Sequence, residues 1–200
     1  MTGRPRTVSD EAIFEAVTAV VSEAGPSRLT LSAVAAKAGL SAPALAQRFG
    51  SKRNLLVSYA AASAVGVDDL FRRARTRSSD ALSALRAGLI AFASPVATRS
   101  ALANHLAFLH LDLTDPELGR HAAEQSRLLR RCITDLLREA QAAGHLTDVD
   151  PVALADTLYT TYNGALVTWA IDGRGSLARW LGERLDRVLG PHVRRPPEKG

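Results

Sequence analysis

The clearest hydrophobic pattern lies in residues 29–56, where apolar side chains recur at helical spacing in short runs separated by turn residues. The first run predicts a short helix with one small apolar face. Thr30 is placed to cap its start, and Gly39 stands where the chain must leave the helix, in a left-handed turn that glycine adopts without steric cost. The apolar positions of this helix are Leu31, Val34, Ala35 and Ala38.

The second run predicts another short helix, about residues 42–49, whose inward side chains are Leu45 and Phe49. Ser41 is its expected cap, and Pro43 falls in the first turn, where a missing N–H has no cost. The remaining side chains are small or polar, so the outer face can approach a partner closely. They are Ala42, Pro43, Ala44, Ala46, Gln47 and Arg48. The major groove of DNA is wide enough to admit such a helix.

Two cations open the helix that follows, although cations are mildly unfavourable at a helix N-terminus. Ser51 is the expected cap, and Lys52 and Arg53 stand in the first turn. Free backbone N–H groups at such an end bind phosphate well, so this placement indicates an anionic partner.

The rest of the chain alternates helical runs with breaks, and no strand pattern competes with them. A first helix begins at Ser9 or Asp10 and ends at Gly25, before the motif. The later runs cover residues 52–77, 81–93, 98–111, 116–143, 151–172 and 177–189. We therefore predict an all-α protein with a helix-turn-helix domain at 1–56, a fourth helix continuing to about 77 as connector, and a second helical domain at 78–200.

Composition agrees with this fold class and limits the compartment. Hydrophobic residues make up 46% and aromatics only 5%, which favours a helical core. The net charge of +5 suits an anionic partner. Cys132 is the only cysteine, the start of the chain has no apolar signal, and no apolar run would span a membrane. We expect a cytoplasmic protein without disulfides or membrane contact.

The motif resembles the DNA-binding domain of the TetR family of transcriptional regulators. The residues that carry the resemblance are Leu29-Thr30, Val34-Ala35, Ala38-Gly39-Leu40-Ser41, Leu45, Phe49, Ser51-Lys52 and Leu55-Leu56. Ala46 departs from the family, which usually has a tyrosine that touches the DNA backbone at this position. We expect Arg48 to replace part of that contact.

The predicted contacts with double-stranded DNA fall into two groups. Gln47 and Arg48 are the candidates for base edges, because Arg can bond bidentately to guanine and Gln to adenine. Ala42, Pro43 and Ala44 would pack against thymine methyl groups. Thr30, Ser41 and Lys52 would contact phosphate. The simpler alternatives are that Arg48 reaches only phosphate and that Thr30 and Ser41 only cap helices. Arg4 and Arg6 form either a free tail or a basic arm along DNA.

The resemblance also implies a small-molecule effector site inside the C-terminal helices, lined by apolar side chains and a few polar ones. The candidates are Phe92, His105, Phe108, Leu109, Arg127, Tyr159, Tyr162, Asn163 and Trp169. Ordinary core packing is the alternative for each of them. The last two helices are apolar over a wide face, and the resemblance implies that they pair with their copies in a homodimer; a long helical core would give the same pattern.

Other chemistries lack a motif. His105 and His110 are five residues apart and diverge on a helix, and the single cysteine leaves no zinc cluster. The chain contains no glycine-rich phosphate loop and no Gly-x-Ser-x-Gly elbow, so we expect no metal, no cofactor and no enzymatic activity. We predict a repressor that binds a palindromic operator as a homodimer and is released by a small apolar molecule. The competing prediction is a helical protein-interaction module that does not bind DNA.

Overall fold

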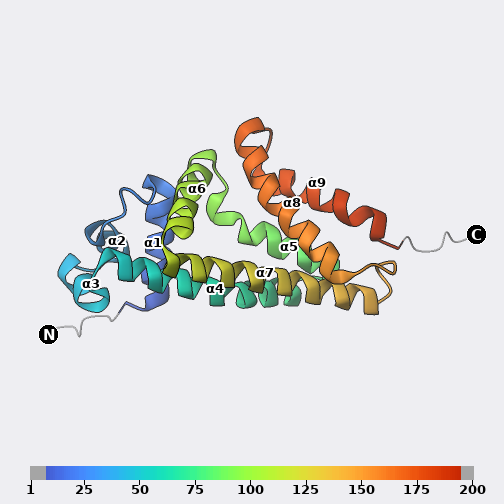
Figure 1. Ribbon diagram of the computed structural model, residues 1–200, viewed down its shortest axis with the longest axis horizontal. Helices are drawn as coiled ribbons and strands as arrows, with labels where there is room; N and C mark the ends of the chain where they lie inside the picture. Colours follow the sequence, from blue (N-terminus) through green and yellow to red (C-terminus); the bar gives the residue numbers. More distant parts are fainter. Residues whose placement is uncertain (1–7, 195–200) are drawn as a thin grey trace, which may run out of the picture.

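The computed structural model describes residues 8–194, and its regular elements there are helices, which confirms the predicted all-α fold (Figure 1). Arg4 and Arg6, the proposed basic arm, lie outside the described residues. The elements are α1 (Asp10–Ala24), α2 (Leu31–Ala38), α3 (Ala42–Phe49), α4 (Lys52–Thr76), α5 (Ala81–Phe92), η1 (Ser94–Val96), α6 (Arg99–Thr114), α7 (Pro116–Ala142), α8 (Pro151–Asp172), α9 (Leu177–Leu189) and η2 (Gly190–His192).

The helix starts follow from local sequence, because a short polar side chain caps each α-helix of the described chain. The caps accept a hydrogen bond from a backbone N–H of the first turn, which would otherwise have no partner. They are Ser9, Thr30, Ser41, Ser51, Asp80, Thr98, Asp115, Asp150 and Ser176. Proline in the first turn of α3, α7 and α8 reinforces these starts.

Two long helices form the spine of the molecule. In Figure 1, α4 and α7 run side by side along the long axis, and their contact is the most extensive between any two elements of the described chain. Helices α1, α2, α3 and α6 gather at one end of this spine, while α8 and α9 lie towards the other. The spine therefore connects the helix-turn-helix to the last two helices directly.

Apolar side chains form two separate clusters, and both include residues of α4 and α7. The N-terminal cluster joins α1 to α4 with one buried residue each from α6 and α7, Phe108 and Leu118. The C-terminal cluster joins the second half of α4 to α5, α7, α8 and α9. Its largest fully buried side chains are Leu85, Leu89, Leu102, Leu129, Ile133, Leu137, Leu146 and Leu158.

Both tryptophans belong to the C-terminal end and fasten the junction between α8 and α9. The indole N–H of Trp169 donates to the carbonyl of Gly175 at 3.2 Å, and that of Trp180 donates to Ala165 at 3.1 Å. The guanidinium of Arg184 stacks 3.1 Å from the Trp180 ring centroid. Gly173 closes α8 in the left-handed conformation, with φ of 51°, which allows the sharp turn into α9.

Candidate nucleic-acid interface and cavities

Helices α2 and α3 are joined by the tight turn that the sequence predicts. Gly39 takes φ of 70°, and Leu40 N–H donates back to Ala35 at 2.8 Å, which fixes the exit from α2. Leu45 anchors α3 with no exposed surface, and Phe49 packs on Phe14 of α1 with ring centroids 6.2 Å apart. The side of α3 opposite Leu45 consequently faces outward.

The residues predicted to contact DNA mostly lie on that outward side. Pro43, Ala44 and Gln47 are exposed, and Ala42 is half-buried. The Gln47 side chain makes no hydrogen bond to another residue in 8–194, so its amide is available to a partner. The outer face of α3 thus carries mostly small side chains and no charge before its last turn.

Thr30 and Ser41 are exposed and serve as helix caps. The Thr30 hydroxyl accepts from Ala33 N–H at 3.1 Å, and the Ser41 hydroxyl accepts from Ala44 N–H at 3.3 Å. Capping uses one acceptor of each hydroxyl and leaves its proton free to donate to an anion. The capping role is therefore compatible with the predicted phosphate contact, which stays a prediction.

Arg48 has protein partners that sequence reasoning missed. Its guanidinium pairs with Asp10 at 2.6 Å and donates to the carbonyl of Val8 at 2.6 Å. It also lies 5.9 Å from the ring centroid of Phe49. Arg48 therefore ties the end of α3 to the start of α1, and a bidentate contact with a base would compete with this pair.

The two cations at the start of α4 also have partners within the chain. Lys52 donates to the carbonyl of Pro26 at 2.9 Å. Arg53 holds Asp115 with two hydrogen bonds of 2.9 and 3.0 Å and reaches Glu117 at 2.9 Å. The bonds from Arg53 hold the pKa of Asp115 below its usual range. The anionic partners of Arg53 thus lie at the corner between α6 and α7. We call Arg53, Asp115 and Glu117 the corner ion cluster.

The predicted effector-site residues occupy two regions. Phe92 and Tyr162 pack in the C-terminal cluster with ring centroids 5.9 Å apart, and Trp169 is buried in the same cluster. Asn163 is exposed although Tyr162 is buried, because successive residues of a helix point about 100° apart. Its side chain donates to the carbonyl of Tyr159. His105 and Phe108 lie on α6, at the other end of the spine.

The remaining candidates of this group lie on the surface or at its edge. Tyr159 is half-buried; its hydroxyl accepts from Ser126 at 2.8 Å, and its ring lies 5.2 Å from the Arg130 guanidinium. Leu109 and Arg127 are exposed. The structure therefore does not gather the predicted residues around one cavity.

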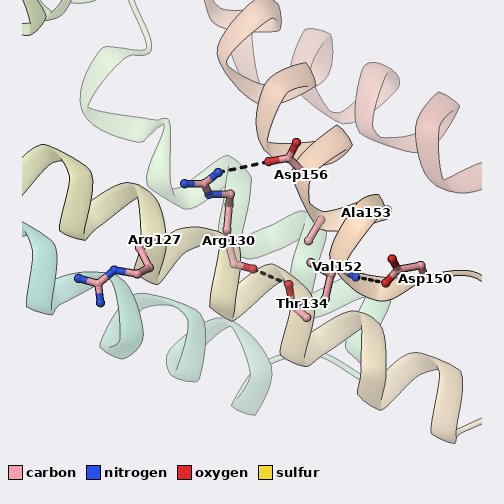
Figure 2. A pocket seen from close by; sticks show the side chains of 8 residues that line it. Arg127, Arg130, Thr134, Asp150, Val152, Ala153 and Asp156 are labelled. Carbon is pink, nitrogen blue, oxygen red and sulfur yellow. Dashed lines mark hydrogen bonds and ion pairs between the residues drawn. The ribbon is translucent and has the colours of Figure 1, made fainter.

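Figure 2 shows the larger of two hollows, an open groove between α7 and the start of α8 with a volume of about 500 Å³. Arg130 crosses it to pair with Asp156 at 3.2 Å, and Arg127 points away from that pair. Arg127 is itself paired with Glu124. Both arginines of the groove are thus paired within the chain, Asp150 caps α8 by accepting from Val152 N–H, and the exposed wall is formed by Val152 and Ala153.

The second hollow, which we call the four-helix cavity, has a volume of about 70 Å³ and lies where α1, α4, α6 and α7 meet. Val21 lines it from α1, and Tyr59, Ala60 and Ser63 line it from α4. The other walls are His105, Phe108 and Asp112 of α6 and His121, Ala122 and Gln125 of α7. Burial raises the pKa of Asp112 to about 6. Two of the predicted residues, His105 and Phe108, therefore do line a cavity.

Aromatic rings connect this cavity to α3. Phe108 meets Tyr59 edge-on at 6.1 Å, Tyr59 meets Phe14 at 6.2 Å, and Phe14 meets Phe49 at 6.2 Å between centroids. The hydroxyl of Tyr59 is also hydrogen-bonded to Thr18 of α1 at 3.1 Å. Four elements thus contribute one ring each to a continuous path of contacts.

Sequence reasoning missed Tyr59, Asp112 and His121 as cavity residues. A usable signal was present, because Asp112 interrupts an apolar run between Leu111 and Leu113. Within residues 8–194, no group of three or more His, Cys, Asp or Glu side chains is arranged to hold a metal ion. No helix in that range is both long and apolar enough to cross a membrane.

Comparisons with known protein families identify the family of this chain. Residues 13–59 match the model of bacterial regulatory proteins of the tetR family. Residues 81–190 match the C-terminal model of BetI-type transcriptional repressors. The chain belongs to the TetR family. The resemblance carried by residues 29–56 is confirmed, and the protein is a transcriptional regulator with a helix-turn-helix DNA-binding domain.

Solved structures of TetR regulators share the fold at low sequence identity. A regulator from Haloarcula marismortui has 16% identity and a TM-score of 0.75, over 92% of this chain and 98% of that one. SmeT, the repressor of a multidrug efflux pump of Stenotrophomonas maltophilia, has 23% identity and a TM-score of 0.65, over 96% and 95%. The SmeT–triclosan complex gives 23% and 0.67, over 92% and 91%. A sequence comparison with curated proteins finds no match.

Proposed function

We propose that this TetR-family protein is a homodimeric repressor whose two α3 helices bind successive major grooves of a palindromic operator and which a small molecule releases. The observation that carries the proposal is the outer face of α3. It presents small side chains and the unengaged amide of Gln47 on a helix anchored from behind by Leu45. We retain 1–56 as the DNA-binding domain and 78–200 as the effector and dimerisation domain.

Homodimerisation is supported by apolar side chains on the outer face of α8. Val167 and Ile171 are one helical turn apart and are 41% and 74% exposed. Gly164 precedes them by a further turn, and nothing approaches it within 4 Å, so a second helix has room to pack closely. A two-fold dimer would bury this row against its own copy, as isologous interfaces do.

Release by a small molecule is supported by what is known of a relative, since SmeT has been solved with triclosan. In this chain the long helix α4 carries the helix-turn-helix at one end and packs in both clusters. An effector that binds more tightly when α4 has shifted would favour a state in which the two recognition helices no longer match the operator. Only such differential affinity can release the protein.

The first test is selection of bound sequences from a random duplex library, followed by salt titration on the enriched site. We expect two inverted half-sites about 34–36 Å apart and an affinity that falls linearly in log–log form with salt. Failure to enrich any site, together with salt-independent binding to a protein partner, would instead support a helical protein-interaction module.

Arg48→Ala then separates base reading from positioning, with Arg138→Ala as the matched control, because Arg138 also has one exposed ion pair within the chain. Relaxed preference at particular base pairs, by about 1–3 kcal/mol, would assign Arg48 to base reading. Uniform weakening across sequences would assign it to phosphate contact or to holding α1 against α3. The control should leave operator affinity unchanged.

Dimerisation is tested by analytical ultracentrifugation of Ile171→Glu. We expect a monomer, because a buried unpaired carboxylate at a two-fold axis is strongly unfavourable. Val65→Glu is the control: Val65 is 73% exposed on α4, away from α8, and its variant should remain a dimer. A monomeric wild-type protein at micromolar concentration would contradict the proposed interface.

A further inference from the structure

The four-helix cavity contains polar side chains that the fold itself does not use. Asp112, His105, His121 and Gln125 line it, and their side chains make no hydrogen bond or ion pair to another residue within 8–194. Asp112, His121 and Gln125 are half-buried and His105 is exposed, so these polar groups stay accessible to a molecule that enters the cavity. Unused groups from α6 and α7 that converge on one cavity are typical of a ligand site.

The charge and hydrogen-bonding character of the cavity define what would fit. Asp112 supplies a carboxylate, and no lysine or arginine lines the cavity. Oxygen acceptors are also offered by Gln125 and by the hydroxyls of Tyr59 and Ser63. A half-buried carboxylate without a partner is stabilised by a cation that carries N–H donors.

The apolar part of the lining defines the rest of the ligand. The ring of Tyr59 and the ring of Phe108 form one wall, and Val21 with Ala60 completes the apolar surface. These groups suit a short hydrocarbon chain beside the charged head. A metal ion does not suit the lining, because the His and Asp side chains are not arranged as a set of three ligands.

We propose that the four-helix cavity binds a small primary amine, whose ammonium group donates to Asp112 and whose carbon chain packs against Tyr59 and Phe108. The occupant is thus cationic, in contrast to the apolar effector predicted from the sequence. Its role as the signal that releases DNA rests on the repressor function proposed above. Binding itself does not rest on that function.

Two physical connections link the cavity to the DNA-binding helices. Asp112 precedes Asp115 by about one turn of α6, and Asp115 is held by Arg53 at the start of α4 in the corner ion cluster. The ring path runs from Phe108 through Tyr59 and Phe14 to Phe49 at the end of α3. An ammonium group that draws Asp112 inward therefore acts on both the start of α4 and the recognition helix.

The test is an NMR titration of the full chain with n-butylamine at constant pH, followed through the imidazole C2–H signals. His105 and His121 line the cavity, whereas His145 and His192 lie near the far end of the molecule and serve as internal controls. We expect saturable shifts of the first pair only, with a dissociation constant of roughly millimolar order, as suits so small a ligand. Absence of saturable shifts at the cavity histidines would overturn the proposal.

Matched probes and variants identify the chemistry. Butan-1-ol lacks the charge and butyltrimethylammonium lacks the N–H donors, and each should bind at least about tenfold more weakly than the amine. Asp112→Asn should weaken amine binding by a similar factor, while Asp148→Asn, an exposed carboxylate in the loop before α8, should not change it. Equal binding of all three probes, or an unchanged constant in Asp112→Asn, would contradict the assigned role of Asp112.

Operator release is measured separately on the enriched duplex, and the two proposals then fail in different ways. If the protein binds the operator but butylamine, bound at the cavity, leaves that affinity unchanged, the regulatory role of the cavity is wrong and the repressor function stands. If no duplex is enriched while the histidine shifts are seen, the repressor function is wrong and the amine site stands. We expect the amine to weaken operator affinity, and Asp112→Asn to lose this response.

Discussion

The N-terminal and C-terminal clusters differ in where their residues come from. The C-terminal cluster is closed mainly by aliphatic side chains of α5, α7, α8 and α9, and it buries Trp169 within itself. The N-terminal cluster is completed by Phe108 and Leu118, which come from well beyond the helix-turn-helix in the sequence. The DNA-binding end therefore depends on the C-terminal part of the chain for its packing, whereas its own α1, α2 and α3 contribute no buried residue to the C-terminal cluster.

The four-helix cavity lies in a region where both parts meet, because its walls come from α1, α4, α6 and α7. Phe108 belongs to the N-terminal cluster, yet it stands on the same helix as Leu102, which belongs to the C-terminal cluster. Helix α6 thus contributes a buried residue to each cluster. Helix α6 is therefore the element through which the proposed amine site would act on the DNA-binding end.

Removing the Phe108 side chain should have the largest effect on the difference in stability between the two clusters. Phe108→Ala leaves a void in the N-terminal cluster and should destabilise the protein by about 3–5 kcal/mol. Phe71→Ala is the matched control, since Phe71 is equally buried but lies in the C-terminal cluster. Hydrogen exchange should accelerate in α1, α2 and α3 for the first variant and in α5 and α9 for the second. Uniform acceleration in both would show that the clusters unfold as one unit.

Gly119→Ala tests the close approach of α6 to α7. A Cβ at Gly119 would lie 2.8 Å from the backbone carbonyl of Asp112, so the corner must open, at a cost of about 1–3 kcal/mol. Gly66→Ala is the control, because nothing lies within 4 Å of that position in α4 and the change should stabilise the helix by about 0.5–1 kcal/mol. Denaturant unfolding measures both; a neutral Gly119→Ala would contradict the tight corner.

Asp112→Asn should change stability in a pH-dependent way. Because burial raises the pKa of Asp112 to about 6, ionisation of this carboxyl above that pH favours the unfolded state, where the ordinary value is 3.8. The variant should therefore be more stable than wild type by about 1–2 kcal/mol at pH 8, and the gain should vanish below about pH 4. Denaturation midpoints across pH provide the measurement, and a gain that grows towards acid would reverse the argument.

Arg53→Gln should have the smallest effect on folding, because its ion pairs are exposed to solvent and exposed pairs contribute little. Its clearest signature is the pKa of Asp115, which should return towards the ordinary aspartate range when the guanidinium is lost. Carboxyl NMR titration measures this shift, with Asp112 in the same spectrum as a reference. An unchanged Asp115 pKa would mean that the corner ion cluster does not hold in solution.

Most of the fold could be predicted from sequence, because helix starts are decided within a few residues. A cap such as Thr30 or Asp80 bonds to an N–H three positions later, so its signal is local. The contacts of the candidate site are not local. Arg53 and Asp115 are 62 positions apart, and Arg48 and the carbonyl of Val8 are 40 apart.

The lining of the four-helix cavity could likewise be predicted only in part, because its residues are far apart in the sequence. His105 and Phe108 could be named because their residue types suit a ligand pocket. Their grouping with Tyr162 and Trp169 assumed one pocket, whereas the length of the spine holds the two ends apart and Asn163 faces outward. Which long-range neighbours share a cavity depends on helix packing, which single-sequence periodicity does not encode.

The placement of the two tryptophans has a consequence for spectroscopy. Both indoles lie at the junction of α8 and α9, one almost fully buried and the other stacked beneath Arg184. Intrinsic tryptophan emission therefore reports on the C-terminal end alone and is insensitive to loosening of the helix-turn-helix. If the helix-turn-helix unfolds before the C-terminal cluster, this signal alone will not register the loss of the DNA-binding end.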